Sequence, residues 1–178
     1  MRTSAQPKFE GLTILGRNGG AVPLSPDKAK LEAFKNVYAT RNYRIRFDCP
    51  EFTSLCPVTG QPDFGHIVID YVPNRLCLES KSLKLYLFAF RNCDIFHEEA
   101  VNRILNDVVK AIRPLAATVT GEFRPRGGIA IRVEASHPAP EDNTQRICPI
   151  FTWRKPEANR ASPRQLRGRK RKKGVDRA

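Results

Sequence analysis

A cysteine and a carboxylate lie seven residues apart in a turn-rich stretch of this 178-residue chain. Cys56 and Asp63 flank a turn formed by Thr59 and Gly60, and such a turn can bring Asp63 back toward the Cys56 sulfur. A thiol with a nearby carboxylate can act as a nucleophile whose proton the carboxylate takes up and later returns. The alternative is a packed, inert cysteine beside an aspartate that caps the turn.

Two lysines and two serines stand together at residues 79–84, Glu-Ser-Lys-Ser-Leu-Lys. Lys81 and Lys84 are three apart and share one face of an expected helix. Ammonium groups, hydroxyls and the free amides at a helix start can together hold a phosphate. The alternative is a solvated, well-capped helix surface.

His97 and Glu98 stand at the front of a second expected helix. The Glu98 carboxylate can accept two parallel hydrogen bonds from an N–C–N edge such as that of guanine. The alternative is that Glu98 favours the positive end of the helix dipole and that His97 is simply exposed.

Composition excludes several classes of protein. The longest uninterrupted apolar run, residues 85–90, is far shorter than the roughly 20 residues that cross a bilayer, so no membrane-spanning helix is expected. The five cysteines are an odd number and form no C-x-x-C pair, which favours free thiols over a disulfide scaffold. No apolar segment follows the first residues, so a signal peptide is not expected and a cytoplasmic location is predicted. No cysteines or histidines have finger-like spacing, and the common nucleotide-binding and hydrolase motifs are absent, so no metal site is expected.

The net charge of +13 is concentrated at one end of the sequence. Residues 154–178 carry eleven Lys and Arg against two acidic residues. We expect a basic disordered tail that binds polyanions weakly and without specificity. Taken without the three clusters above, such a tail on a small domain would indicate an RNA-binding module.

The spacing of apolar residues predicts four strands and two helices. The strands are expected around residues 43–47, 67–71, 115–124 and 129–135, and the helices at residues 80–91 and 97–112. An apolar strand is the alternative at residues 80–91. Asp94 is expected to cap the second helix, and residues 49–65 to form a loop. This order predicts an α+β fold, a four-stranded antiparallel sheet with two helices on one face.

The first 36 residues are expected to be a lead-in to the folded domain. Ser25 and Pro26 predict the start of a short helix from which Leu31 and Phe34 face the core. The domains are therefore a lead-in at 1–36, a catalytic domain at 37–153 and the basic tail at 154–178.

Four runs of residues, read in order, carry a resemblance to a known family. They are residues 51–64, residues 79–84, residues 96–98 and residues 124–128. From Tyr43 to Trp153 the chain resembles the QueF-type nitrile reductases of queuosine biosynthesis, in their short single-module form. These are NADPH-dependent 7-cyano-7-deazaguanine reductases of the tunnelling fold. Another tunnelling-fold purine or pterin enzyme, such as a cyclohydrolase, is the alternative and would need a metal.

The resemblance implies a four-electron reduction of 7-cyano-7-deazaguanine to 7-aminomethyl-7-deazaguanine by NADPH. Cys56 would form a covalent thioimide with the nitrile, and Asp63 would be its proton partner. The implied substrate-binding residues are Leu78, Glu79, Ser80, His97 and Glu98, and the implied cofactor-binding residues are Lys81, Lys84, Arg124 and Arg126. The family also implies a homo-oligomeric barrel, two stacked rings of five subunits, with the sites between subunits.

Overall fold

The structure is a computed structural model, and it describes residues 23–138. The expected tail at 154–178, with its polyanion binding, and the segment before Pro23 lie outside the described residues.

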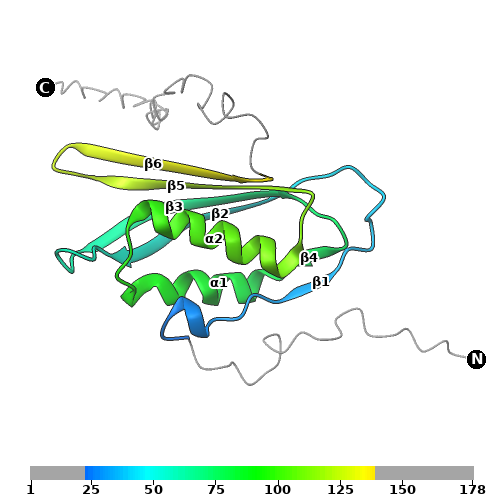
Figure 1. Ribbon diagram of the computed structural model, residues 1–178, viewed down its shortest axis with the longest axis horizontal. Helices are drawn as coiled ribbons and strands as arrows, with labels where there is room; N and C mark the ends of the chain where they lie inside the picture. Colours follow the sequence, from blue (N-terminus) through cyan, green and yellow to red (C-terminus); the bar gives the residue numbers. More distant parts are fainter. Residues whose placement is uncertain (1–22, 139–178) are drawn as a thin grey trace, which may run out of the picture.

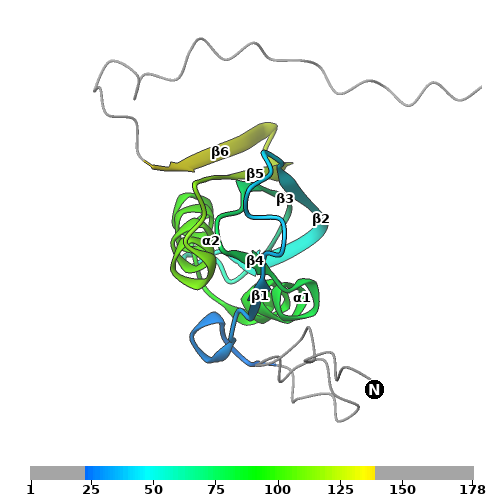
Figure 2. The same cartoon turned by 90° about the vertical axis from the view of Figure 1, so that its right-hand side faces the viewer.

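Four antiparallel strands form the main sheet in the order β2-β3-β5-β6. The strands are β2 (Ile45–Leu55), β3 (Pro62–Val72), β5 (Ala116–Arg126) and β6 (Ile129–His137). Helices α1 (Ser80–Phe88) and α2 (His97–Ile112) lie on one face of this sheet, as Figures 1 and 2 show. The predicted α+β architecture, with two helices on one face of a four-stranded antiparallel sheet, is therefore confirmed.

The core fills the space between the sheet and the two helices. Ile67 and Ile69 of β3 belong to it together with Val101 and Ile104 of α2, and all four side chains are fully buried. Burying an aliphatic side chain of this size contributes about 1.5 to 3 kcal/mol, so the helix is held mainly by this apolar face. Gly121 of β5 permits the close approach, because a Cβ there would stand 2.6 Å from Val101 Cγ2.

Helix α2 occupies the predicted residues, but its expected cap is wrong. The residue before the helix is Phe96, whose side chain makes no capping hydrogen bond, and Asp94 instead belongs to an isolated bridge with Leu55 of β2. The helix ends where Arg113 adopts a left-handed conformation, with φ of 46°. Within residues 23–138 no helix is long and apolar enough to span a bilayer.

A second, two-stranded sheet was missed from the sequence. Strand β1 (Ala33–Lys35) pairs antiparallel with β4 (Leu76–Leu78), after a single 3-10 turn, η1 (Pro26–Lys28). The expected helix carrying Phe34 is therefore wrong, since Phe34 lies in β1. The Glu79 N–H donates to the Glu32 carbonyl and the Asn36 N–H to the Arg75 carbonyl, so this segment finds its backbone partners beside β4.

The expected loop at 49–65 is mostly strand. β2 continues to Leu55 and β3 begins at Pro62, which leaves a short turn at residues 56–61. A shift of register between Cys49 and Phe52 interrupts the alternation of side chains along β2, and this bulge made the sequence look like a loop.

Candidate active site

Cys56 is the first residue of the turn between β2 and β3. The turn is closed by its own backbone: the Cys56 N–H donates to the Gln61 carbonyl at 2.9 Å, and the Gly60 N–H donates to the Cys56 carbonyl at 2.8 Å. Gly60 has φ of 67°, a left-handed conformation that suits glycine. The side chain of Cys56 is consequently fixed at the end of the sheet and remains partly exposed.

The turn activates the Cys56 thiol. A hydrogen bond from the Thr59 hydroxyl, followed by backbone hydrogen bonds from Thr59 and Val58, lowers the pKa of Cys56 to about 7, with a smaller contribution from Arg126. Burial instead raises the pKa of Cys49 to about 11. Because the thiolate is the nucleophile, Cys56 is well suited to attack at neutral pH and Cys49 is not.

Asp63 points into the protein from the second position of β3. Its side chain is 7% exposed, and its Oδ1 lies 3.0 Å from Arg126 Nε and 3.3 Å from His97 Nε2. The structure therefore brings Asp63 to the base of the Cys56 turn, with its carboxylate against two side chains from other elements. The sequence predicted Asp63 beside the turn, but it did not predict these two partners.

His97 lies flat on an aromatic ring of the sheet. Its ring stacks on Phe123 with 3.9 Å between centroids and 16° between planes. Its Nε2 is buried and, despite the short distance to Asp63, makes no hydrogen bond among the described residues. Ser54, which pairs across the ladder with Asp63, also has a buried hydroxyl without a hydrogen-bond partner there. Buried polar groups usually have partners, so a polar ligand reaching this corner would gain hydrogen bonds from both.

A short parallel bridge brings the start of α2 to the Cys56 turn. The Leu55 N–H donates to the Cys93 carbonyl at 3.0 Å, and the Ile95 N–H donates to the Leu55 carbonyl at 3.1 Å. The segment before α2 is thereby fixed to the last residue of β2. This contact between distant parts of the chain places His97 near Asp63, and no local pattern in the sequence indicates it.

Arg126 reaches the site from the β5–β6 hairpin. Its Nη2 donates to the Pro62 carbonyl at 2.8 Å while its Nε faces the Asp63 carboxylate. Gly127 and Gly128, with φ of 55° and 82°, form the tight turn that follows. The sequence placed Arg126 among the cofactor-binding residues, whereas the structure places its guanidinium on Asp63.

Glu79 caps helix α1. It is buried, its Oε1 accepts from the Lys81 N–H at 2.8 Å, and its Oε2 accepts from the Ser82 N–H at 2.7 Å. Both carboxylate oxygens are thus engaged by the helix. Of its neighbours, Leu78 is buried and donates its N–H to the Tyr71 hydroxyl, while Ser80 is exposed.

The remaining predicted residues are accessible from solvent. Glu98 is exposed in the first turn of α2, Lys84 is exposed on α1, and Lys81 is partly exposed. Arg124 is exposed on β5, with its guanidinium 5.6 Å from the centre of the Phe64 ring.

Arg91 connects the hollows that Lys84 and Arg124 line. One hollow includes Arg124, Phe64 and Pro62, and an adjoining one includes Lys84 and Phe88. Both are lined by Arg91, whose guanidinium lies 4.2 Å from the centre of the Phe88 ring. The sequence analysis missed Arg91 because it stands alone, outside any cluster.

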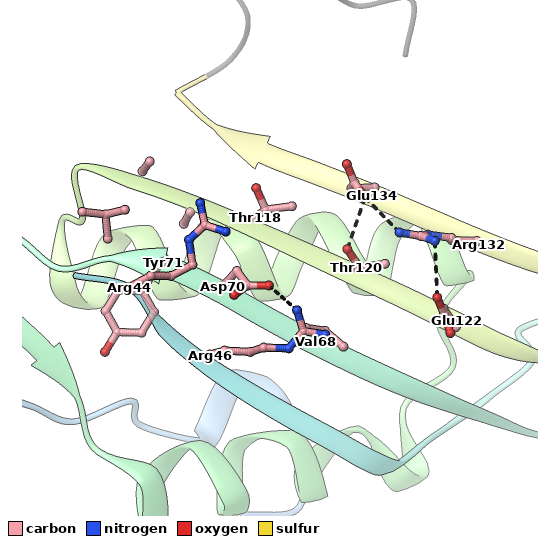
Figure 3. Close-up of a pocket in the computed structure, with 13 residues that line it drawn as sticks. Arg44, Arg46, Val68, Asp70, Tyr71, Thr118, Thr120, Glu122, Arg132 and Glu134 are labelled. Carbon is pink, nitrogen blue, oxygen red and sulfur yellow. Dashed lines mark hydrogen bonds and ion pairs between the residues drawn. The ribbon is translucent and has the colours of Figure 1, made fainter. Parts of the chain in front are cut away.

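A third hollow lies on the helix-free face of the sheet, and Figure 3 shows its charged lining. Arg46 pairs with Asp70 at 3.0 Å, and Arg132 lies 3.5 Å from Glu122 and 3.3 Å from Glu134. These opposite charges largely neutralise one another, so this face offers no concentrated charge for a ligand. Among residues 23–138 no three His, Cys, Asp or Glu side chains gather as a metal site would require.

Comparisons with known proteins identify the family of the chain. Residues 62–142 match the family model described as QueF-like protein. The chain is 49% identical over 131 residues to the NADPH-dependent 7-cyano-7-deazaguanine reductase of Bacillus subtilis (strain 168), covering 74% of this chain and 79% of the relative. It is 50% identical over 128 residues to the enzyme of the same name from Streptococcus thermophilus (strain ATCC BAA-491 / LMD-9), covering 72% and 78%. The chain belongs to the QueF family.

The span that matches the QueF family model includes Asp63 and its two partners but begins after the Cys56 turn. Asp63, His97 and Arg126 lie within it, and Cys56 precedes it. A structural comparison also matches the apo crystal structure of the archaeosine synthase QueF-Like, with a TM-score of 0.47 and 24% identity over 53% of this chain and 90% of that one. The resemblance stated from the sequence motifs is confirmed by the longer alignments to the QueF-family reductases.

Proposed function

We propose that this protein reduces 7-cyano-7-deazaguanine to 7-aminomethyl-7-deazaguanine with NADPH, the activity for which its relatives are named, through a thioimide on Cys56. The observation that carries the proposal is a thiol of lowered pKa on the turn above the buried Asp63 carboxylate, which His97 and Arg126 contact. An activated thiol with a carboxylate at the base of its turn is the combination that addition to a nitrile needs.

Cys56 and Asp63 would carry out the addition together. The sulfur bonds to the nitrile carbon, one π bond of the nitrile breaks, and the nitrogen accepts the proton that left the thiol. Asp63 relays this proton, a role that typically contributes about 10² to 10⁴ in rate. When bound, NADPH supplies hydride to the carbon, and two such transfers complete the four-electron reduction. After the first transfer the C–S bond would break, Cys56 would regain its thiolate, and the imine would have to stay bound until it is reduced. The second transfer needs one further proton on the nitrogen, and the Cys56 thiolate takes up another to restore the thiol, so the overall reaction consumes two protons from water.

Recognition of the deazaguanine would fall to the start of α2. The exposed Glu98 carboxylate can accept the paired hydrogen bonds of the guanine-like edge, and His97 offers a nitrogen that has no hydrogen-bond partner in the described residues. Of the residues Leu78 to Ser80, the exposed Ser80 would contribute most directly, because both oxygens of Glu79 are held by α1 and the Leu78 and Glu79 N–H groups donate within the protein.

The cofactor phosphates would lie along the cations around the adjoining hollows. Lys84, Arg91 and Arg124 line these hollows, and Lys81 is three residues from Lys84 on α1. Accessible ammonium and guanidinium groups fit an anionic dinucleotide. Arg126, also expected among these residues, is treated separately below because of its contact with Asp63.

The sheet has two edges that would allow assembly. In the described part of the chain, β2 and β6 each pair on one side only. We propose that edge pairing between copies forms the family's barrel of two stacked rings of five in the cytoplasm, with sites between subunits. The unpaired edges support this assembly, and the ring size rests on the resemblance alone.

A nitrile-dependent loss of NADPH absorbance tests the proposal. The protein should consume two NADPH per nitrile, and Glu98→Ala should weaken nitrile binding by about 2 to 4 kcal/mol through the lost charge-assisted pair. Glu99→Ala removes the same charge from the same helical turn and is the matched control. Absence of NADPH consumption by the wild-type protein would contradict the proposed function, and equal effects of the two variants would indicate that Glu98 acts only on the helix dipole.

A further inference from the structure

We propose that Arg126 is a positioning residue for Cys56 and Asp63, holding the carboxylate beside the thiol before any cofactor binds, and that it is not a ligand of the cofactor phosphates. This inference rests on the proposed function, since it assigns Arg126 to the first step of that reaction. The two neighbouring arginines then have different roles: Arg124 binds the cofactor, and Arg126 positions Asp63.

The guanidinium of Arg126 fixes two consecutive residues. Nη2 donates to the Pro62 carbonyl at 2.8 Å, and Nε lies 3.0 Å from Asp63 Oδ1. The planar guanidinium makes both contacts at once, so it fixes the direction of the Asp63 side chain as well as its position. Arg126 is also the smallest of the influences that lower the pKa of the Cys56 thiol. Arg126 thus holds the carboxylate at the base of the turn that carries the nucleophile.

The shape of β5 explains why Arg126 turns inward. Strict alternation would place Arg124 and Arg126 on the same face of the strand. The register between β5 and β6 shifts between Phe123 and Arg126, and Pro125 lies in this irregular stretch. Arg124 therefore remains exposed over the Phe64 ring, while Arg126 is directed to the buried Asp63.

Burial makes the ion pair costly to break. The Asp63 side chain is 7% exposed and that of Arg126 is 38% exposed, so the carboxylate lies in the protein and the cation closes it from solvent. A guanidinium that left to bind a phosphate would strand a buried carboxylate, which is strongly unfavourable. Lys84, Arg91 and Arg124 line the adjoining hollows and can meet phosphates at no such cost.

The test separates thioimide formation from cofactor binding. Wild-type protein, Arg126→Met, Arg126→Lys and the matched control Arg124→Met are each mixed with the nitrile without NADPH, and the rate of the mass increase is followed by intact mass spectrometry. NADPH affinity is measured separately on each folded variant by fluorescence titration. The first measurement is independent of cofactor binding, because no cofactor is present.

Arg126→Met should slow adduct formation by about tenfold or more, because the carboxylate is no longer held in place, and should change the NADPH dissociation constant less than about threefold. Arg126→Lys should recover part of the rate. Arg124→Met should show the opposite pattern, with weaker NADPH binding and an unchanged rate of adduct formation. An Arg126→Met protein that forms the adduct at the wild-type rate but binds NADPH weakly would overturn the inference.

Failure of the proposed function would look different. A wild-type protein that forms no adduct contradicts the proposed reaction, and the role of Arg126 is then decided by the pH dependence of Cys56 alkylation with iodoacetamide. Arg126→Met should shift that profile to higher pH and Arg124→Met should not, since Arg126 is held at the base of the Cys56 turn by the Pro62 carbonyl and Asp63, and it is Arg126 that helps to lower the pKa of the thiol. An unshifted profile in Arg126→Met would overturn the inference.

Discussion

At the scale of single residues, the reactivity of Cys56 is set by its own turn. The strongest influences on the thiol come from the Thr59 hydroxyl and the amides of Thr59 and Val58, ahead of Arg126. The sequence identified Cys56 and Asp63 from their types and spacing. It did not indicate that Thr59 would contact the sulfur, because that contact depends on the exact path of the backbone through the turn.

Among the four cysteines of residues 23–138, Cys56 should be the first to react with iodoacetamide. Its pKa of about 7 means that the thiolate fraction, and with it the rate, rises through neutral pH and falls below it. Cys49, whose pKa burial raises to about 11, should stay unmodified under the same conditions. Peptide mapping by mass spectrometry across a pH series measures both.

Thr59→Val tests the cause of this reactivity. This substitution removes the hydroxyl and keeps the size of the side chain. It should move the pH profile of Cys56 alkylation to higher pH, because the largest stabilisation of the thiolate is lost. If the alkylation rate of wild-type Cys56 instead has its midpoint near the ordinary pKa of a thiol, about 8.5, the turn does not lower the pKa of Cys56.

The position of Ser54 and His97 beside Asp63 could not be predicted from the sequence. Ser54 and His97 carry buried polar atoms without hydrogen-bond partners in the described region. Both residues are ordinary in the sequence, and their importance comes from the pairing of β2 with β3 and from the stacking on Phe123. Only the assembled structure shows that they adjoin Asp63.

At the scale of elements, long regular segments were predictable and short or irregular ones were not. The apolar spacing of α2 and the alternation of the β5–β6 hairpin matched the structure. Strands β1 and β4 are three residues each, too short for a period to emerge, and the bulge in β2 disguised a strand as a loop. The elements that were missed or predicted wrongly are those that form through contacts between distant segments of the chain.

Helix α1 gives a test of the role of Glu79. Glu79→Ala should lower the free energy of unfolding by about 1 to 3 kcal/mol, because two amides at the helix start lose their acceptor. Urea unfolding followed by circular dichroism, at a fixed protein concentration, measures the change. Glu99→Ala, which removes an exposed carboxylate from α2, should have a much smaller effect.

The opposite result would assign Glu79 differently. If Glu79→Ala unfolds at the wild-type urea concentration but requires far more nitrile for turnover, the carboxylate acts on the substrate and the capping role is secondary.

At the scale of the whole molecule, the two faces of the sheet have different tasks. The helix-covered face holds the core. At the end of this face lies the turn that carries Cys56, with Asp63 and His97 beside it. The opposite face carries paired opposite charges around Arg46 and Arg132. The predicted architecture was right because one apolar face per strand requires a covering layer of helices. The assembly of the subunits could not be derived in the same way. The outer strands β2 and β6 show only that the sheet has two edges at which another copy could pair.

The decisive measurement is the intact mass of the protein after mixing with 7-cyano-7-deazaguanine in the absence of NADPH. The mass should rise by that of one nitrile per chain, because addition of a thiol to a nitrile releases no atom. This adduct should disappear on addition of NADPH and should not form in Cys56→Ala. An adduct of the same mass that persists in Cys56→Ala would contradict the thioimide on Cys56.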